Sequence, residues 1–125
     1  MRLLQLTTVL VADDLTTTSD AALRTAAALR DAGGARLHVV HVAPAGTAMA
    51  AHGGVPAEDQ HAMQDGAVRA KVATDYTPHV LTGSAGEAIG PLADRISADV
   101  IVTGRREHGA VQSNRRLGGT PFDII

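Results

Sequence analysis

Four short apolar runs alternate with segments of helical periodicity along this chain. The runs lie at residues 8–12, 37–42, 79–82 and 100–102, and their length and their valine, leucine and isoleucine content predict strands. Between them, apolar residues spaced by three and four positions predict a helix after Thr18, a helix over 58–73 and a helix after Gly83. This order predicts an α/β fold, an open parallel sheet with helices on both faces.

The composition limits the class of protein and its partners. A length of 125 residues suits a single domain spanning 1–125. The net charge of −2 argues against general binding to nucleic acid or to an anionic membrane surface. The chain has no cysteine, and its first residues form neither a membrane span nor a cleavable leader. We therefore expect a cytoplasmic protein without disulfides or thiolate metal sites.

Two pairs of residues have the spacing of helix caps. Thr17 lies three residues before Asp20, and Ser84 lies three residues before Glu87. In such a capping box the hydroxyl and the acidic side chain each accept a backbone N–H group that the helix leaves unpaired. The pairs predict that the first and third helices begin there.

Glycine and proline predict where the helices are interrupted. The pair 33–34 ends the first helix, because glycine adopts the left-handed conformation that terminates a helix. Pro91 lies inside the third helix and removes one of its hydrogen bonds, so we expect that helix to be bent or divided. Residues 43–57 are mostly alanine, glycine and proline, which predicts a flexible loop.

The stretch after the last predicted strand predicts a phosphate site. It runs from Gly104 to Thr120, beyond the carboxyl end of the strand, where open α/β sheets bind their ligands. Its glycines let backbone N–H groups approach a phosphate. Thr120 followed by Pro121 is typical of a helix N-terminus, which favours an anion. The alternative is that these glycines only turn a surface loop.

Positively charged side chains accompany this loop. Guanidinium groups suit phosphate oxygens, and the loop contains Arg105, Arg106, Arg115 and Arg116. We expect Arg105 or Arg106 to touch a ligand, because they adjoin the strand end, and the others to be solvated. His108 lies in the same loop and is expected to be solvated as well.

At this loop the sequence resembles the universal stress protein family, whose nucleotide-binding members carry the pattern G-x2-G-x9-G-[S/T] after the fourth strand. Gly109, Gly119 and Thr120 match its second half, whereas Arg106 stands where the first glycine belongs and Gly104 lies two residues earlier. In the family the first strand ends in the pattern V-x-x-D-x-S. The similar segment here has Asp14 and Thr16 at the D and S positions. The resemblance continues in the V-H-V of residues 40–42 and in the glycine at position 83.

The resemblance implies an adenine-nucleotide (ATP) binding protein of the stress response, with no catalytic residue and at most weak ATP hydrolysis. Asp14 would face the adenosine end of the nucleotide, and Val42 would present its backbone to adenine. The residues expected around the phosphates, with Mg²⁺ as an optional companion of ATP, are Gly104, Arg105, Gly109, Gly119 and Thr120.

Family members continue from the loop into a full helix and a fifth strand, whereas this sequence stops at PFDII. We expect the last helix and the fifth strand to be missing, either because the chain is a shortened relative or fragment, or because another subunit completes the sheet. Residues 100–102 would then form an apolar sheet edge, which invites association, for example as a homodimer. An alternative function is therefore an interaction module that binds no nucleotide and acts by dimerisation.

Other site chemistries find less support in the sequence. Asp13 and Asp14 after the first strand are similar to the acidic pair of response-regulator receiver domains, but the phosphoacceptor aspartate and the lysine of those domains have no counterpart at the strand ends. The structural alternative is that Asp13 caps the turn. His38 and His41 lie on opposite faces of a strand, so they predict no shared metal. No serine lies in a nucleophile elbow.

Overall fold

The computed structural model describes residues 6–46, 55–72, 75–104 and 122–124. Its strands are β1 (Thr8–Ala12), β2 (Arg36–Ala43), β3 (Thr77–Thr82), β4 (Val100–Gly104) and β5 (Phe122–Ile124). Its helices are α1 (Asp20–Gly33), α2 (Ala57–Arg69) and α3 (Ala85–Ile96), with a 3-10 turn, Thr17–Ser19, before α1. All four predicted strands and all three predicted helices are therefore present, and their ends differ from the prediction by a few residues.

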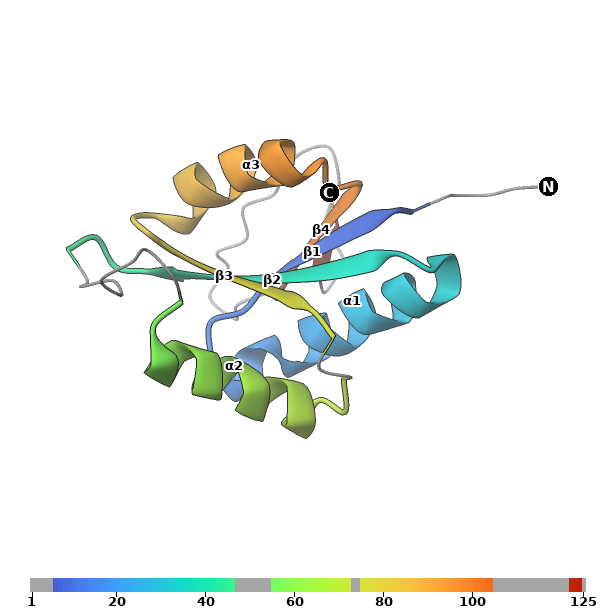
Figure 1. Cartoon of the computed structure of the whole chain (residues 1–125), viewed down its shortest axis with the longest axis horizontal. Coiled ribbons are helices and arrows are strands. Elements are labelled where there is room, and N and C mark those ends of the chain that lie inside the picture. Colours follow the sequence, from blue (N-terminus) through green and yellow to red (C-terminus); the bar gives the residue numbers. More distant parts are fainter. Residues whose placement is uncertain (1–5, 47–54, 73–74, 105–121, 125) are drawn as a thin grey trace.

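The sheet has the order β3-β2-β1-β4-β5, and its first four strands are parallel. Helices α1 and α2 cover one face and α3 covers the other, as Figure 1 shows. This is the open parallel sheet with helices on both faces that the alternating pattern predicted. None of the helices in the described part of the chain is long and apolar enough to cross a membrane.

The prediction that the fifth strand is missing is wrong. Residues Phe122–Ile124 form β5, which pairs antiparallel with β4 through the partners Ile124 and Val102. The expected continuation of Thr120 and Pro121 into a helical turn is wrong for the same reason, because the residues that follow them are extended. An edge strand presents unpaired N–H and C=O groups, and a short extended segment of the same chain pairs with residues Val102, Thr103 and Gly104 of that edge.

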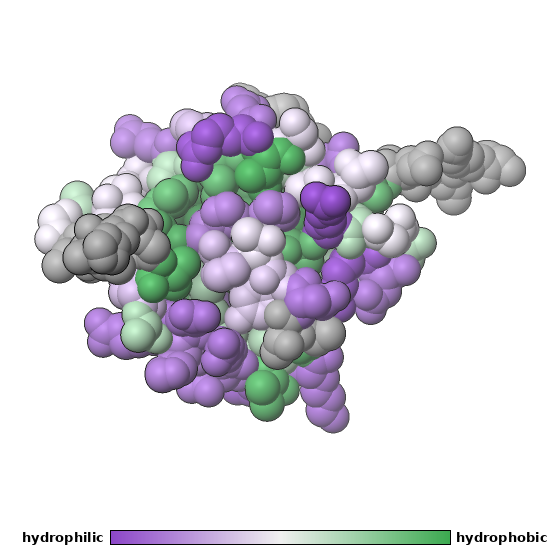
Figure 2. All heavy atoms as spheres, in the orientation of Figure 1, coloured by the Kyte–Doolittle hydropathy of each residue, from purple (hydrophilic) through white to green (hydrophobic). Residues whose placement is uncertain are grey.

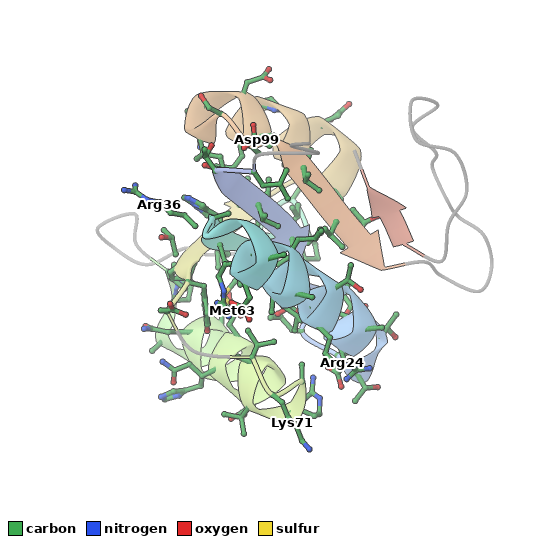
Figure 3. The ribbon with its side chains drawn as sticks, turned by 90° about the vertical axis from the view of Figure 1, so that its right-hand side faces the viewer. Arg24, Arg36, Met63, Lys71 and Asp99 are labelled. Carbon is green, nitrogen blue, oxygen red and sulfur yellow. The ribbon has the colours of Figure 1, made fainter. Side chains whose placement is uncertain are left out.

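Two apolar clusters form the core, one on each face of the sheet. On the face of α1 and α2, alternate strand residues such as Val9 and Val11 pack with Leu23 and Met63. Met63 points from α2 toward α1 and the sheet in Figure 3, whereas Lys71 and Arg24 point outward. On the other face Leu10, Val40 and Ile101 pack under Leu92 and Ala93 of α3. The period of two along each strand divides the residues between the clusters.

The two predicted capping boxes form only in part. Thr16, not Thr17, caps the first helical segment, and its hydroxyl accepts the Thr18 N–H group. The intervening 3-10 turn moves the start of α1 to Asp20, so Thr17 and Asp20 form no capping box. Ser84 is the N-cap of α3 as predicted, but its side chain makes no capping hydrogen bond. The spacing of these residues therefore predicted where the two helical segments begin, but not which capping hydrogen bonds form there.

Glycine and proline behave differently in α1 and α3. Gly34 ends α1 in the left-handed conformation, with φ of 68°, as predicted. Pro91 lies inside α3, which is a single continuous helix, so the expected division does not occur. Pro91 is exposed, and a carbonyl that loses its helical partner on the solvent side can bond to water instead. Most of the predicted loop 43–57, residues 47–54, lies outside the described residues.

Asp99 joins the beginnings of β1 and β4, and Figure 3 shows it at that end of the sheet. Its Oδ2 accepts the N–H groups of Thr7 and Thr8 at 2.8 and 3.0 Å, together with the Thr7 hydroxyl at 2.9 Å. These hydrogen bonds lower the pKa of the Asp99 carboxyl. They also fix the register of two neighbouring strands that are distant in sequence.

Candidate functional site

A pocket of about 300 Å³ lies at the carboxyl ends of β1, β2 and β4. The chain adds β2 and then β3 on one side of β1, and returns through α3 to place β4 on the other side. The order of the strands therefore reverses between β1 and β4, and open α/β sheets have a crevice at such a point. The pocket lies where ligands bind in open α/β sheets.

One wall of the pocket is apolar. The residues that form it are Ala12, Val40, Val42, Ala85 and Ile89. The strand residues in this set belong to the face covered by α3, and the two helix residues come from its first turns. Hydrophobic surface, green in Figure 2, is visible in the upper part of the molecule, where Figure 1 shows α3. Such a wall suits a flat apolar group.

The pocket lining also contains polar residues, among them Asp14. This exposed carboxylate accepts three hydrogen bonds on Oδ1, from the Thr16 N–H at 2.9 Å and from the hydroxyls of Thr16 and Ser19 at 2.7 Å each. The buried Ser19 hydroxyl also accepts the Asp14 N–H at 2.8 Å. Asp14 is therefore held in one orientation at the pocket edge.

The neighbouring Asp13 is buried, with only 4% of its surface exposed. Its Oδ1 accepts the Leu15 N–H at 2.8 Å, so Asp13 caps the turn as predicted, and Leu15 is left-handed with φ of 66°. Its Oδ2 is buried without a hydrogen-bond partner among the described residues. Burial raises the pKa of the Asp13 carboxyl, and Asp14 raises it further, against the lowering effects of the Leu15 hydrogen bond, of His41 and of the Ser19 hydroxyl.

Gly104 lies where β4 passes closest to the turn that precedes α1. A Cβ atom at this position would lie 3.3 Å from the carbonyl oxygen of Thr18. Glycine is therefore explained here by close packing of the turn against β4. The same residue lines the pocket beside Thr103, so any larger side chain would disturb both the turn and the pocket.

The structure brings together part of the predicted site. Asp14, Val42 and Gly104 line one pocket although they lie at the carboxyl ends of three different strands. The other predicted binding residues, Arg105, Gly109, Gly119 and Thr120, lie outside the described residues. Arg106, His108, Arg115 and Arg116 lie outside them as well, so the predicted phosphate loop remains a prediction.

Sequence reasoning missed Ser19 and gave His41 no role. Ser19 belongs to the hydroxyl-rich segment directly after Asp14, and that clustering was the available signal. The Nδ1 atom of His41 lies 2.9 Å from the carbonyl oxygen of Asp13, and His41 lines the pocket. His38 instead contacts His79, with 2.9 Å between Nδ1 and Nε2. The two histidines therefore diverge as predicted, and within the described ranges no three acidic or histidine side chains form a metal cluster.

Comparison with known proteins gives consistent results. The model of the universal stress protein family matches residues 6–121. Protein Rv1636 from Mycobacterium tuberculosis H37Rv is 25% identical over 94% of this chain and 85% of that chain, with a TM-score of 0.63. A universal stress protein solved in complex with cAMP is 26% identical over 94% and 87% of the two chains, with a TM-score of 0.67.

A more distant structure agrees in fold. The universal stress protein UspA from Lactobacillus plantarum is 20% identical over 89% of this chain and 88% of that chain, with a TM-score of 0.60. At that identity the likeness concerns the fold alone. A search of curated proteins found no match.

Proposed function

Because the chain belongs to the universal stress protein family, we propose that its pocket binds an adenine nucleotide. The composition of the pocket supports this proposal: an apolar wall faces a fixed carboxylate at the carboxyl ends of β1, β2 and β4. A similar protein has been solved in complex with cAMP.

We assign each part of the nucleotide to a part of the pocket lining. The wall that includes Val42 and Ile89 accepts the planar base, and the Val42 backbone supplies polar groups to its edge. Asp14 accepts hydrogen bonds from ribose hydroxyls, since its orientation is already fixed by Thr16 and Ser19. The chain after Gly104 carries the glycines and arginines proposed for the phosphates.

We propose binding without strong catalysis. The titratable side chains that line the described pocket are Asp13, Asp14 and His41. We assign Asp14 to the ribose, and the His41 ring contacts a backbone carbonyl, so we assign neither as a general base for an attacking water. Mg²⁺ bound with ATP would take carboxylate and phosphate oxygens, and Asp14 is the lining carboxylate that could contribute.

Nucleotide occupancy would then act as a signal in the stress response, in the cytoplasm and within a homodimer. The alternative, an interaction module that binds no nucleotide, was favoured by the expected open edge at 100–102. Because β5 pairs with β4 at Val102, Thr103 and Gly104, that edge is covered in part, which weakens this support for the alternative. The arginine at position 106, where the family has its first glycine, also favours the alternative.

The proposal is tested by titrating nucleotide-free protein with cAMP, AMP and ATP in a calorimeter, and by mass spectrometry of small molecules that copurify. Saturable binding of at least one nucleotide is expected. Heats no larger than dilution for all three, with nothing copurified, would contradict the proposal.

A matched pair of variants locates the binding. Ala85 and Ala57 are both exposed first residues of helices, but only Ala85 lines the pocket. Ala85→Trp should weaken binding by at least about tenfold, because the indole fills the space of the base. Ala57→Trp should leave binding unchanged. Equal loss in both variants would place the ligand elsewhere.

A further inference from the structure

The hydroxyl group of Ser19 is turned toward Asp14 and not toward the helix that follows it. Ser19 directly precedes α1, where a serine side chain commonly caps a helix, yet it makes no capping hydrogen bond. Its Oγ donates to Oδ1 of Asp14 at 2.7 Å and accepts the Asp14 N–H at 2.8 Å. Ser19 is buried, with 3% of its surface exposed, and it lines the pocket. The hydroxyl therefore supports the pocket carboxylate instead of the helix.

The 3-10 turn explains why α1 does not need this hydroxyl. The Ser19 N–H donates to the Thr16 carbonyl at 3.1 Å, and the Asp20 N–H donates to the Thr17 carbonyl. These two N–H groups at the start of α1 are thus paired with backbone oxygens of the turn. The Ser19 side chain is consequently available for a contact outside the helix.

Tertiary packing fixes the place of Ser19. At Gly104 of β4 an added Cβ would lie 3.3 Å from the Thr18 carbonyl oxygen and 4.0 Å from the Ser19 Cα. The turn therefore packs directly on the backbone of β4, and close packing leaves it little freedom to shift. A buried hydroxyl on such a turn is a firm support for the Asp14 side chain, which is itself exposed.

Resting on the proposed function, we propose that Ser19 is a positioning residue that makes the pocket prefer nucleotides with a free sugar hydroxyl. A carboxylate accepts hydrogen bonds and donates none, so Asp14 favours a ligand that brings a hydroxyl donor. A deoxy sugar displaces water from the carboxylate without replacing the hydrogen bond. Ser19 strengthens the preference, because an acceptor that is already oriented loses little conformational entropy when the ligand binds.

Thr16 also donates to Asp14, but its surroundings differ. Thr16 is exposed, and its hydroxyl accepts the Thr18 N–H at 3.2 Å in addition to its contact with Asp14. Water can replace an exposed hydrogen bond of this kind, whereas the buried Ser19 leaves water little access to the other contact. Loss of the Ser19 hydroxyl should therefore release the carboxylate more than loss of the Thr16 hydroxyl.

The experiment compares nucleotides with analogues that lack every free sugar hydroxyl. The probes are ATP with 2′,3′-dideoxy-ATP and cAMP with 2′-deoxy-cAMP, titrated by calorimetry in the presence of a metal chelator. The unmodified protein should bind at least one parent about tenfold more tightly than its analogue. Ser19→Ala should reduce this preference to about threefold or less, through the affinity for the parent, and leave the affinity for the analogue nearly unchanged.

A matched serine and a double variant serve as controls. Ser84 also directly precedes a helix without a side-chain capping bond, but it lies outside the lining of the described pocket. Ser84→Ala should keep the preference of the unmodified protein. Asp14→Ala should remove the preference, and adding Ser19→Ala to it should change nothing further, because Ser19 acts through Asp14.

The outcomes separate the inference from the proposed function. An unchanged preference in Ser19→Ala overturns the inference, while nucleotide binding stands. Equal loss of parent and analogue in Ser19→Ala also overturns it, since Ser19 would then only support the fold. Equal affinity of the unmodified protein for parent and analogue overturns the inference together with the assignment of Asp14 to the ribose. If neither parent binds, the inference fails, and AMP binding then decides whether the proposed function fails as well.

Discussion

The two faces of the sheet are covered to different extents, and the site lies on the less covered one. Two helices, α1 and α2, cover one face and contribute Met63, Leu23 and a row of buried alanines. The other face has α3 alone, and its cluster is completed by half-buried residues such as Val42 and Ile89 (Figure 1).

This difference shows how one sheet serves both stability and binding. Alanine-rich helix faces let α1 approach the strands closely, which excludes water from that face. On the other face the single helix leaves apolar surface uncovered at the carboxyl ends of the strands, where the pocket lies. We therefore expect substitutions on the first face to change mainly stability, and those on the second to change mainly binding.

The largest expected difference comes from truncating one side chain on each face. Met63 is 1% exposed in α2, and Met63→Ala should lower the free energy of unfolding by about 3 kcal/mol through lost burial and a cavity. Ile89 is half-buried at the pocket, and Ile89→Ala should cost about 1 kcal/mol. Urea unfolding measures both. Equal losses would show that the two faces are packed alike.

Neutralising Asp13 should stabilise the protein. Its pKa is raised from the ordinary value of 3.8, so the folded state binds the proton more tightly than the unfolded state. The free energy of unfolding therefore falls as pH rises through the folded pKa. Asp13→Asn removes this fall and should be about 1 kcal/mol more stable at pH 7. Urea unfolding at pH 4 and pH 7 checks this, and a less stable variant at pH 7 would contradict it.

A smaller gain is expected from adding one methyl group to α2. Gly66 lies inside the helix, and a Cβ there would be 3.6 Å from Leu23 Cδ1, an ordinary contact distance. Gly66→Ala should therefore raise the free energy of unfolding by about 0.5–1 kcal/mol, because alanine favours a helix more than glycine does. Thermal unfolding measures the shift. A lower melting temperature would mean that this face has no space for a methyl group.

The smallest expected effect is a change of stability with pH that comes from His38 and His79. Burial lowers the pKa of His38 and His79, and Arg36 and Arg95 respectively contribute in the same direction. The unfolded chain binds their protons more readily, so stability is lost as pH falls below about 6.5.

His79→Gln should reduce the loss in free energy of unfolding at low pH by about 0.5 kcal/mol. The value is small because solvent screens both rings. Chemical denaturation at pH 5 and pH 7.5 measures it, with His61→Gln on the exposed side of α2 as the control. Identical behaviour of the two variants would argue against a role for the histidine pair.

The fold could be predicted from the sequence wherever a local pattern and the tertiary structure agree. The strand Thr8–Ala12 was predicted with the bounds that the structure has, because an apolar run ended by two aspartates has few other solutions. Gly34 was predicted correctly because its left-handed conformation is a local property. The division of α3 at Pro91 and the absence of a fifth strand were predicted wrongly. An exposed carbonyl can bond to water, and a free sheet edge can pair with a segment that has a weak pattern of its own.

The site was predictable only where its residues are strand ends. Asp14, Val42 and Gly104 each follow or end a predicted strand, and parallel strands bring their carboxyl ends to one edge of the sheet. Ser19 escaped prediction because a 3-10 turn returns it to Asp14, and no period in the sequence signals such a turn. The contact of His41 with the Asp13 carbonyl likewise joins two strands and has no local signal.

The sequence by itself determined that two carboxylates, Asp13 and Asp14, stand together directly after β1. Only the tertiary structure decided which of the two carboxylates is buried and which is exposed. The packing of α2 at Gly66 encloses Asp13 and leaves its Oδ2 without a donor. On the other face, α3 leaves the strand ends open, so Asp14 remains at the edge of a pocket. Burial depends on what covers a face, and the chain that covers these aspartates lies many residues away.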